Sequence, residues 1–285
     1  ITIGDLIAEW NLGIWFRDYY LTPFTGAIWS TPITKILEFP ALPMIKFMKN
    51  HGLLGTAGQH NWRTVKGGSR EYVSRVETVL LNSGVQIRAS NPAQSVRRVK
   101  GGVEVKAADG EYEFFDEVIF ATHSDITLDI LRDPTDTEKG SLEAVKYQPN
   151  KMLLHADTAI MPKRRAAWAS WVYTEDKEHK SDRIDLTYWI NRLQSLPEDD
   201  PCFVTLNSQR PINPSLVYDE YIFRHPVFDL AALKAQRDLR NLNGSNSTWF
   251  CGAWMRDGFH EDGLATGIGV AQLILERSCT NIAAE

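Results

Sequence analysis

Three ionisable side chains stand next to one another close to the end of the sequence. His260, Glu261 and Asp262 follow a hydrophobic run that stops at a glycine, and Gly263 then opens an apolar pattern with helical spacing. A helix N-terminus stabilises negative charge, and a histidine exchanges protons near neutral pH. The stretch therefore predicts a site that handles protons or a developing negative charge. The alternative is a helix cap, in which Asp262 or Glu261 accepts a backbone N–H and His260 is solvated.

Two short strands and two helices would have to position these side chains. The run "TWFCGAW" at 248–254 is β-like and leads directly into the ionisable stretch, which a final helix follows. A second β-branched run, "EVIFAT" at 117–122, precedes Ser124 and the helical segment "ITLDILRD".

The segment between residues 59 and 140 alternates helical and β-like patterns. An apolar stripe that begins at Tyr72 predicts a helix, and Gly84 ends it before "VQIR" at 85–88, which reads as a strand. The pairs Gly101-Gly102 and Asp109-Gly110 each separate two β-rich runs and predict hairpins.

The rest of the chain has a different character. Residues 1–58 are helical and rich in aromatic side chains, whereas 145–225 contain aromatic strand-like runs split by polar loops. These patterns predict a separate mixed sheet with helices beside it. The fold class is therefore α/β, or mixed α+β.

Composition narrows the class of function. The net charge of −5 does not favour binding to nucleic acid or to an anionic membrane, and no apolar run reaches the roughly 20 residues of a membrane helix. Three well-separated cysteines allow neither a disulfide framework nor a CxxC metal pair, so we expect a cytoplasmic setting and no metal. Nine tryptophans indicate either a large core or a wide pocket for a flat or apolar ligand.

Three motifs, in this order and spacing, carry a family resemblance: "TVKGGSREYV" at 64–73, "VIFATHSD" at 118–125 and "WFCGAWMRDGFHEDGLATG" at 249–267. The chain resembles the flavin-containing amine oxidoreductase superfamily over essentially its whole length. That superfamily includes monoamine oxidases, protoporphyrinogen oxidase and phytoene-type desaturases, and the nearest likeness is to its bacterial branch of NAD/FAD-binding proteins.

The resemblance implies a flavoprotein that binds FAD non-covalently. Members of the superfamily begin with a strand, a G-x-G-x-x-G turn and a helix that hold the FAD diphosphate. This sequence has no such unit, because "GIGVAQ" at 267–272 lies inside the last helix and carries Gln where a small residue is needed. The resemblance therefore implies that an N-terminal portion precedes this sequence in the whole protein, or that the protein is a remnant. In either case we expect these 285 residues alone to bind FAD poorly and to be inactive.

The resemblance also implies four domain segments. Residues 1–58 would form the helical part of a substrate domain, and 141–225 its sheet. Residues 59–140 and 226–285 would form the FAD-side layer, interleaved with the substrate domain. This layer would hold the runs "EVIFAT" and "TWFCG" in one sheet and would lack the first βαβ unit of the family.

Cofactor-binding positions follow from matching the motifs. Gly252 and Gly263 match glycines that admit the backbone close to the flavin, and the Asp262 N–H would face the ring. Ala253 stands where many relatives carry an acidic residue that binds ribityl hydroxyls, which weakens flavin binding. Val96 matches the residue whose backbone holds the adenine and is equally a buried strand valine. The remaining matches are Gly67, Gly68, Ala121 and Thr122.

Catalytic positions are implied in the same way. His260 and Glu261 would lie beside the ring and face the substrate. Lys151 falls where amine oxidases keep a lysine that holds a water near the flavin; a desolvated lysine would suit that role, but an ordinary lysine at a strand start is the favoured alternative. Aromatic and basic residues of the substrate segment would line a pocket or form plain core: Trp168, Trp171, Tyr188, Trp189 and Arg192.

Two functions remain open at this point. The first is an FAD-dependent oxidoreductase that removes a hydride from a C–N or C–C bond of an apolar or lipid-like substrate. The second is a non-catalytic relative that acts as a small-molecule or lipid binding module. Sequence alone determines neither the substrate, nor the electron acceptor, nor the oligomeric state.

Overall fold

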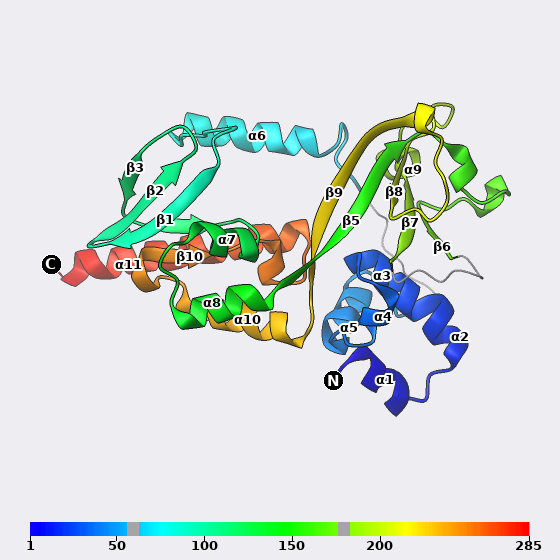
Figure 1. Cartoon of the computed structure of the whole chain (residues 1–285), viewed down its shortest axis with the longest axis horizontal. Coiled ribbons are helices and arrows are strands. Elements are labelled where there is room, and N and C mark those ends of the chain that lie inside the picture. The colour runs from blue at the N-terminus through cyan, green and yellow to red at the C-terminus, as the bar shows by residue number, and fades with distance from the viewer. Residues whose placement is uncertain (56–62, 176–182, 285) are drawn as a thin grey trace. The chain divides into compact units, whose positions relative to one another are not determined.

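The computed structural model describes residues 1–55, 63–175 and 183–284. Two compact units result, each built from two stretches of chain: residues 1–87 with 147–225, and residues 88–146 with 226–285. The chain passes between the units after helix α6, at the start of strand β5 and at the end of strand β9 (Figure 1).

The first unit begins with short helices. They are α1 (Ile3–Glu9), α2 (Ile14–Phe16), a π-helical turn (Arg17–Leu21), α3 (Thr22–Trp29), α4 (Ile33–Ile36) and α5 (Ala41–Asn50). Thr2 caps α1 in a capping box with Asp5. The interior of this helical part contains Ile3, Ile36 and Phe39, none more than 2% exposed. Burial of these side chains holds helices together that are too short to be stable alone.

A five-stranded sheet in the order β6-β7-β8-β5-β9 forms the rest of the first unit. Its strands are β5 (Lys146–His155), β6 (Trp171–Thr174), β7 (Asp185–Trp189), β8 (Phe203–Leu206) and β9 (Val217–Val227), with α9 (Ile190–Gln194) after β7. Strands β6, β7, β8 and β5 pair antiparallel. The predicted separate sheet of aromatic strands is thus present, but these pairings are antiparallel rather than mixed.

The second unit combines a meander with a small parallel sheet. The meander is β1 (Ala93–Val99), β2 (Gly102–Ala107) and β3 (Tyr112–Phe115), and both predicted hairpins are confirmed. Strands β4 (Val118–Phe120) and β10 (Thr248–Phe250) pair in parallel, as expected. Around them lie α7 (Ser124–Ile130), α8 (Asp136–Ala144), α10 (Leu230–Leu242) and α11 (His260–Ala284) (Figure 1).

Helix α6 (Ser69–Asn82) is the predicted helix, but none of its residues is buried. The strand predicted at 85–88 is absent, and that prediction is wrong. A strand needs a neighbour for its backbone groups, and here the Val85 N–H instead donates to Leu80 O at the end of α6. The sequence pattern was β-like, but no pairing partner accompanies it among the described residues.

The compact units and the expected domain segments have different boundaries. The first unit includes α6, and its first stretch ends at residue 87, whereas the expected FAD-side segment begins at 59. The second stretch of the first unit begins at 147, whereas the expected sheet segment begins at 141. The assignment of these segments to a cofactor side and a substrate side stays a prediction.

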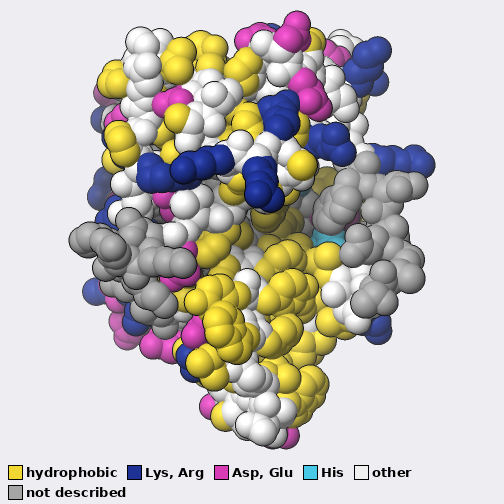
Figure 2. Space-filling view, turned by 90° about the vertical axis from the view of Figure 1, so that its right-hand side faces the viewer, with side chains coloured by type: hydrophobic (Ala, Val, Ile, Leu, Met, Phe, Trp, Pro, Cys, Tyr) yellow, Lys and Arg dark blue, Asp and Glu magenta, His cyan; other side chains and the backbone are white. Residues whose placement is uncertain are grey.

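An exposed aromatic patch covers part of the first unit. It consists of Trp10, Ile14, Trp15, Phe16, Tyr19 and Tyr20, which are 41–73% exposed. Trp15 stacks on Tyr19, and Phe16 stacks on Tyr20, so four of these rings form two stacked pairs. Figure 2 shows hydrophobic side chains gathered on the end of the molecule that carries α2. Among the helices described, none has the length and apolar content to cross a membrane.

Candidate functional site

The carboxyl ends of β4 and β10 form the centre of the candidate site. In a parallel α/β sheet, ligands bind outside the carboxyl ends of the strands. Ala121 and Thr122 follow β4 and are exposed, while Gly252 and Ala253 follow β10 and are partly exposed. The indole N–H of Trp254 donates to Thr122 O at 2.9 Å and ties the two strand ends together. Four predicted cofactor positions are therefore brought to one edge of one small sheet.

Gly252 has a backbone conformation that favours glycine. Its φ of +132° lies in the region that L side chains rarely adopt. A Cβ there would come within 3.1 Å of the Trp254 indole nitrogen. The Gly252 N–H donates to Thr266 Oγ1 at 3.0 Å, so the strand end is fastened to α11. The predicted requirement for glycine at this position agrees with its conformation.

Asp262 acts as a cap on α11. Its Oδ2 accepts the Phe259 N–H at 3.0 Å, and its Oδ1 lies 3.4 Å from Arg256 Nε. The Asp262 N–H donates to Phe259 O at 3.0 Å. The cap alternative is therefore realised for the side chain. The backbone N–H that the resemblance directs at a flavin ring also has a partner inside the protein.

His260 and Glu261 are exposed residues of the first turn of α11. Gly263 follows in the helix, and a Cβ built on it would lie 3.7 Å from Ala253 N, an ordinary contact. The protein's own atoms thus leave room for a small side chain at Gly263. The steric need for glycine that the resemblance implies would have to come from a bound group.

Val96 is buried in β1 at 1% exposure. It pairs with Val105 of β2, and its carbonyl oxygen accepts the Arg132 backbone N–H at 2.9 Å. The structure therefore shows the buried strand valine. Its predicted contact with adenine would have to use groups that already take part in these pairings.

Gly67, Gly68 and Lys151 belong to the first unit, whereas the positions above belong to the second. Both glycines have positive φ, +86° and +80°, and form the turn before α6. The Lys151 side chain is 51% exposed and pairs with Glu220 at 3.0 Å. Lys151 is therefore not desolvated in this structure, and the ordinary-lysine alternative agrees with its surroundings.

The aromatic residues of the sheet divide into core and edge. Trp189 is 5% exposed and meets Trp168 edge-on, while Trp168 also contacts Phe203. Trp171 is 43% exposed. Burial raises the pKa of Tyr188 to about 12. Trp168 and Trp189 thus belong to the packed interior, with the Arg165 guanidinium stacked over both rings.

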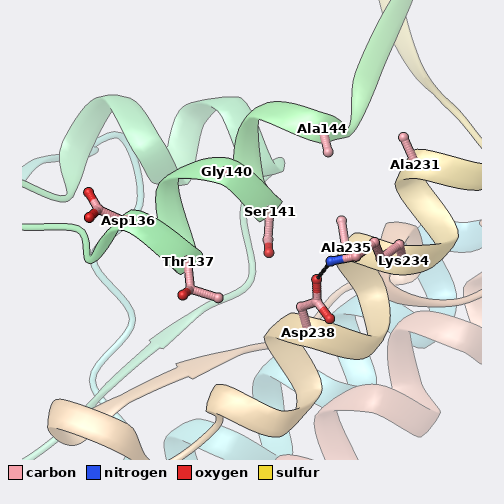
Figure 3. A pocket seen from close by; sticks show the side chains of 9 residues that line it. All are labelled: Asp136, Thr137, Gly140, Ser141, Ala144, Ala231, Lys234, Ala235 and Asp238. Atoms are coloured by element: carbon pink, nitrogen blue, oxygen red, sulfur yellow. Dashed lines mark hydrogen bonds and ion pairs between the residues drawn. The ribbon is translucent and has the colours of Figure 1, made fainter.

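A groove between α8 and α10 has a volume of about 270 Å³ (Figure 3). Most of the residues that line the groove are small, and Lys234 and Asp238, which form an ion pair, also line it. It contains none of the residues that the sequence singled out.

Sequence reasoning missed three residues of the site: Trp254, Thr266 and Arg256. Trp254 and Thr266 join the strand ends and the helix, and Arg256 pairs with Asp262. All three stand inside the motif at 249–267, so their position was visible. Their roles were not, because each role depends on a partner that only folding brings close.

No family model matches the sequence, and no curated protein matches it. Solved structures do match. A candidate protoporphyrinogen oxidase from an Exiguobacterium species has 15% identity, a TM-score of 0.67, and coverage of 97% of this chain and 67% of its own. An A394C variant of a putrescine oxidase has 15% identity, a TM-score of 0.66, and coverage of 97% and 68%. The cyclohexylamine oxidase of Brevibacterium oxydans has 11% identity, a TM-score of 0.61, and coverage of 97% and 67%.

The chain thus shares its fold with these oxidases and spans about two thirds of the length of each structure.

Proposed function

We propose that the chain is part of an FAD-dependent oxidoreductase that removes a hydride from a C–N or C–C bond of an apolar or lipid-like substrate. One observation carries the proposal. The exposed carboxyl ends of two parallel strands are fastened to the N-terminus of a long helix, within a fold shared with amine oxidases. This arrangement presents backbone atoms and a helix dipole to one bound group.

The residues at the strand ends fit a flavin. Gly252 carries no Cβ beside Trp254, and the space next to Gly263 is open enough for ordinary contact. The first turn of α11 offers its positive end to a group that becomes anionic on reduction. Gly252, Ala253 and Gly263 would hold the ring, with Ala121 and Thr122 beside it. When bound, the flavin accepts the hydride that the substrate loses.

His260 and Glu261 would act on the substrate. Both are exposed at the start of α11, next to the residues assigned to the ring. A histidine there can hold or move a proton at its imidazole nitrogens near neutral pH, and the Glu261 carboxylate can orient a substrate that carries an amine. Asp262 has a different task, because its carboxylate already caps the helix.

The exposed aromatic patch of the first unit supports an apolar substrate. Trp and Tyr side chains combine an apolar body with a polar tip and are enriched where protein meets lipid. Six large side chains, five aromatic and one aliphatic, lie exposed within residues 10–20. A patch of this size is uncommon without a binding role.

The experiment is a titration of the purified chain with FAD, followed by amide chemical shifts in NMR spectra. We expect saturable shifts at Gly252, Ala253 and Gly263, with an affinity weaker than micromolar. Uniform small shifts across the chain, or saturable shifts confined to other residues, would count against the proposed site.

A non-catalytic binding module is the second candidate, and the aromatic patch and Ala253 favour it. Ala253 provides no acidic group for the ribityl hydroxyls, and the patch offers apolar contact without redox chemistry. Visible flavin colour in protein isolated under native conditions supports the oxidoreductase. A colourless protein that binds apolar probes at the patch and does not take up FAD supports the binding module.

A further inference from the structure

Thr266 links the end of β10 to the first turns of α11. Its Oγ1 accepts the Gly252 N–H at 3.0 Å and lies 2.9 Å from the Asp262 carbonyl oxygen. The hydroxyl also lies 3.0 Å from Gly263 O and 3.2 Å from Gly252 O. Because a hydroxyl has one proton, it accepts from Gly252 and donates to one of these carbonyls at a time.

This link fixes the two backbone segments that the proposed flavin site requires. On the strand side, the Cys251 N–H donates to Phe120 O at 3.0 Å and continues the β10–β4 pairing. The residue before Gly252 is therefore also fixed to β4. On the other side, Thr266 lies one turn after Asp262, which caps the helix. The Thr266 hydroxyl is therefore the polar contact that sets the distance between the turn at Gly252 and the helix N-terminus.

We propose that Thr266 is a positioning residue of the flavin site, acting through Gly252. This inference rests on the proposed function. Because the Thr266 hydroxyl accepts the Gly252 N–H, this amide is not available to a ligand. A ligand at the strand end would therefore meet the Gly252 Cα hydrogens and the following peptide. Without the hydroxyl, the Gly252 amide loses its partner and the turn separates from the helix.

The test compares Thr266→Val, which keeps the shape and removes the hydroxyl, with Thr266→Ser, which keeps the hydroxyl. The control is Thr78→Val. In the exposed helix α6, the Thr78 hydroxyl makes the same bond to the carbonyl four residues before it, and this bond stays within the helix. Any effect of losing a back-bond within a helix therefore shows in the control.

Two readouts are taken on each variant: hydrogen exchange of the Gly252 amide without FAD, and the FAD dissociation constant from amide shifts. Thr266→Val is expected to speed Gly252 exchange at least tenfold and to weaken FAD binding about fivefold, the effect of one neutral hydrogen bond. Thr266→Ser should restore both values, and Thr78→Val should change neither.

Three results would overturn the inference: Gly252 protection that survives Thr266→Val, FAD binding that does not respond to it, or a serine variant as impaired as the valine variant. Failure of the proposed function is distinguishable. It shows as no saturable FAD binding in the unmodified chain, which also removes the flavin part of this inference, while Gly252 exchange still reports on the link itself.

Discussion

The indole N–H of Trp254 donates to the carbonyl oxygen of Thr122 across 2.9 Å, although 131 residues separate them in the chain. Trp254 is 4% exposed whereas Thr122 is exposed, so the bond is partly buried. It joins the ends of β10 and β4 just beyond the last ladder pair, Phe250 and Phe120. A two-stranded parallel sheet of three residues per strand has marginal stability by itself. The Trp254–Thr122 bond adds a link between the chain segments that follow the two strands.

Trp254→Phe removes the N–H while keeping an aromatic ring. We expect a loss of about 1 kcal/mol, or about 2 °C in Tm, because the partly buried hydrogen bond is lost. Thermal unfolding measured by circular dichroism checks this. Trp10→Phe, at a side chain 61% exposed, is the control and should leave Tm unchanged. Equal Tm values for the two variants would contradict the assigned role of the bond.

Substitutions of Gly263 and of His260, at the start of α11, are expected to have different effects on the flavoprotein. In the complete flavoprotein, Gly263→Val should abolish flavin retention, because its branched side chain fills the space beside Ala253 that the ring would need. Gly263→Ala should leave the fold unchanged, since a Cβ meets only ordinary contacts with the protein's own atoms, and should weaken flavin retention because that Cβ would lie against the ring. His260→Ala should keep the flavin and impair turnover. Flavin content and single-turnover flavin reduction are the measurements; loss of flavin in His260→Ala would remove His260 from catalysis.

Asp262→Ala is expected to destabilise α11. The change removes the acceptor for the Phe259 N–H and the partner of Arg256, and loss of a cap costs about 1 kcal/mol. Asp262→Asn keeps an acceptor and should lose less. Glu261→Ala, at the exposed neighbouring position, is the matched control and should be neutral within error. The midpoints of urea unfolding are the measurement. If Asp262→Ala is as stable as Glu261→Ala, the capping role of Asp262 is excluded.

Asp185 in β7 is a buried carboxyl group whose Oδ1 has no hydrogen-bond partner among the described residues. Burial raises the pKa of this carboxyl, opposed by the Gln209 N–H that donates to Oδ2 at 2.9 Å. Since the folded pKa lies above the unfolded value, its contribution to stability is present at low pH and is lost as the pH rises through the folded pKa.

Asp185→Asn keeps an acceptor for Gln209 and removes the buried charge. We therefore expect the variant to be more stable than the unmodified chain at pH 7 by about 1 kcal/mol, and the difference to shrink below pH 4. Melting temperatures measured from pH 3.5 to pH 7.5 test this. A variant less stable at pH 7 would show that the charged form makes a favourable contact.

Lys151→Met is expected to leave the fold and the turnover of the flavoprotein unchanged. The lysine is half exposed, and an exposed ion pair with Glu220 contributes well under 1 kcal/mol. Lys35→Met, which removes a similarly exposed pair with Glu38, is the control. Slower flavin reoxidation in Lys151→Met alone would establish the water-holding role that the family resemblance implies.

Local chemistry in the sequence was sufficient for several elements. Gly101-Gly102 and Asp109-Gly110 predicted two hairpins, because glycine and aspartate favour the tight turns that connect antiparallel strands. The β-branched run at 118–120 and the run at 248–250 predicted strands, and their family motifs predicted a shared sheet. The predicted helix after Gly68 formed as well.

Tertiary structure decided what these elements do. The residues at 85–88 have a strand-like pattern, but a strand exists only with a neighbour, and none lies beside them in the described part of the chain. Asp262 had two possible roles until the fold placed the Phe259 N–H and Arg256 next to its carboxylate. Thr266 and Gly252 are 14 residues apart in sequence, and no local pattern records that they meet.

Sequence alone therefore determined the two hairpins, the helix after Gly68 and the glycine at position 252, where the backbone conformation favours that residue. The pairing of polar groups was decided by the fold, because a hydrogen bond depends on distances of about 3 Å that distant segments acquire only on packing.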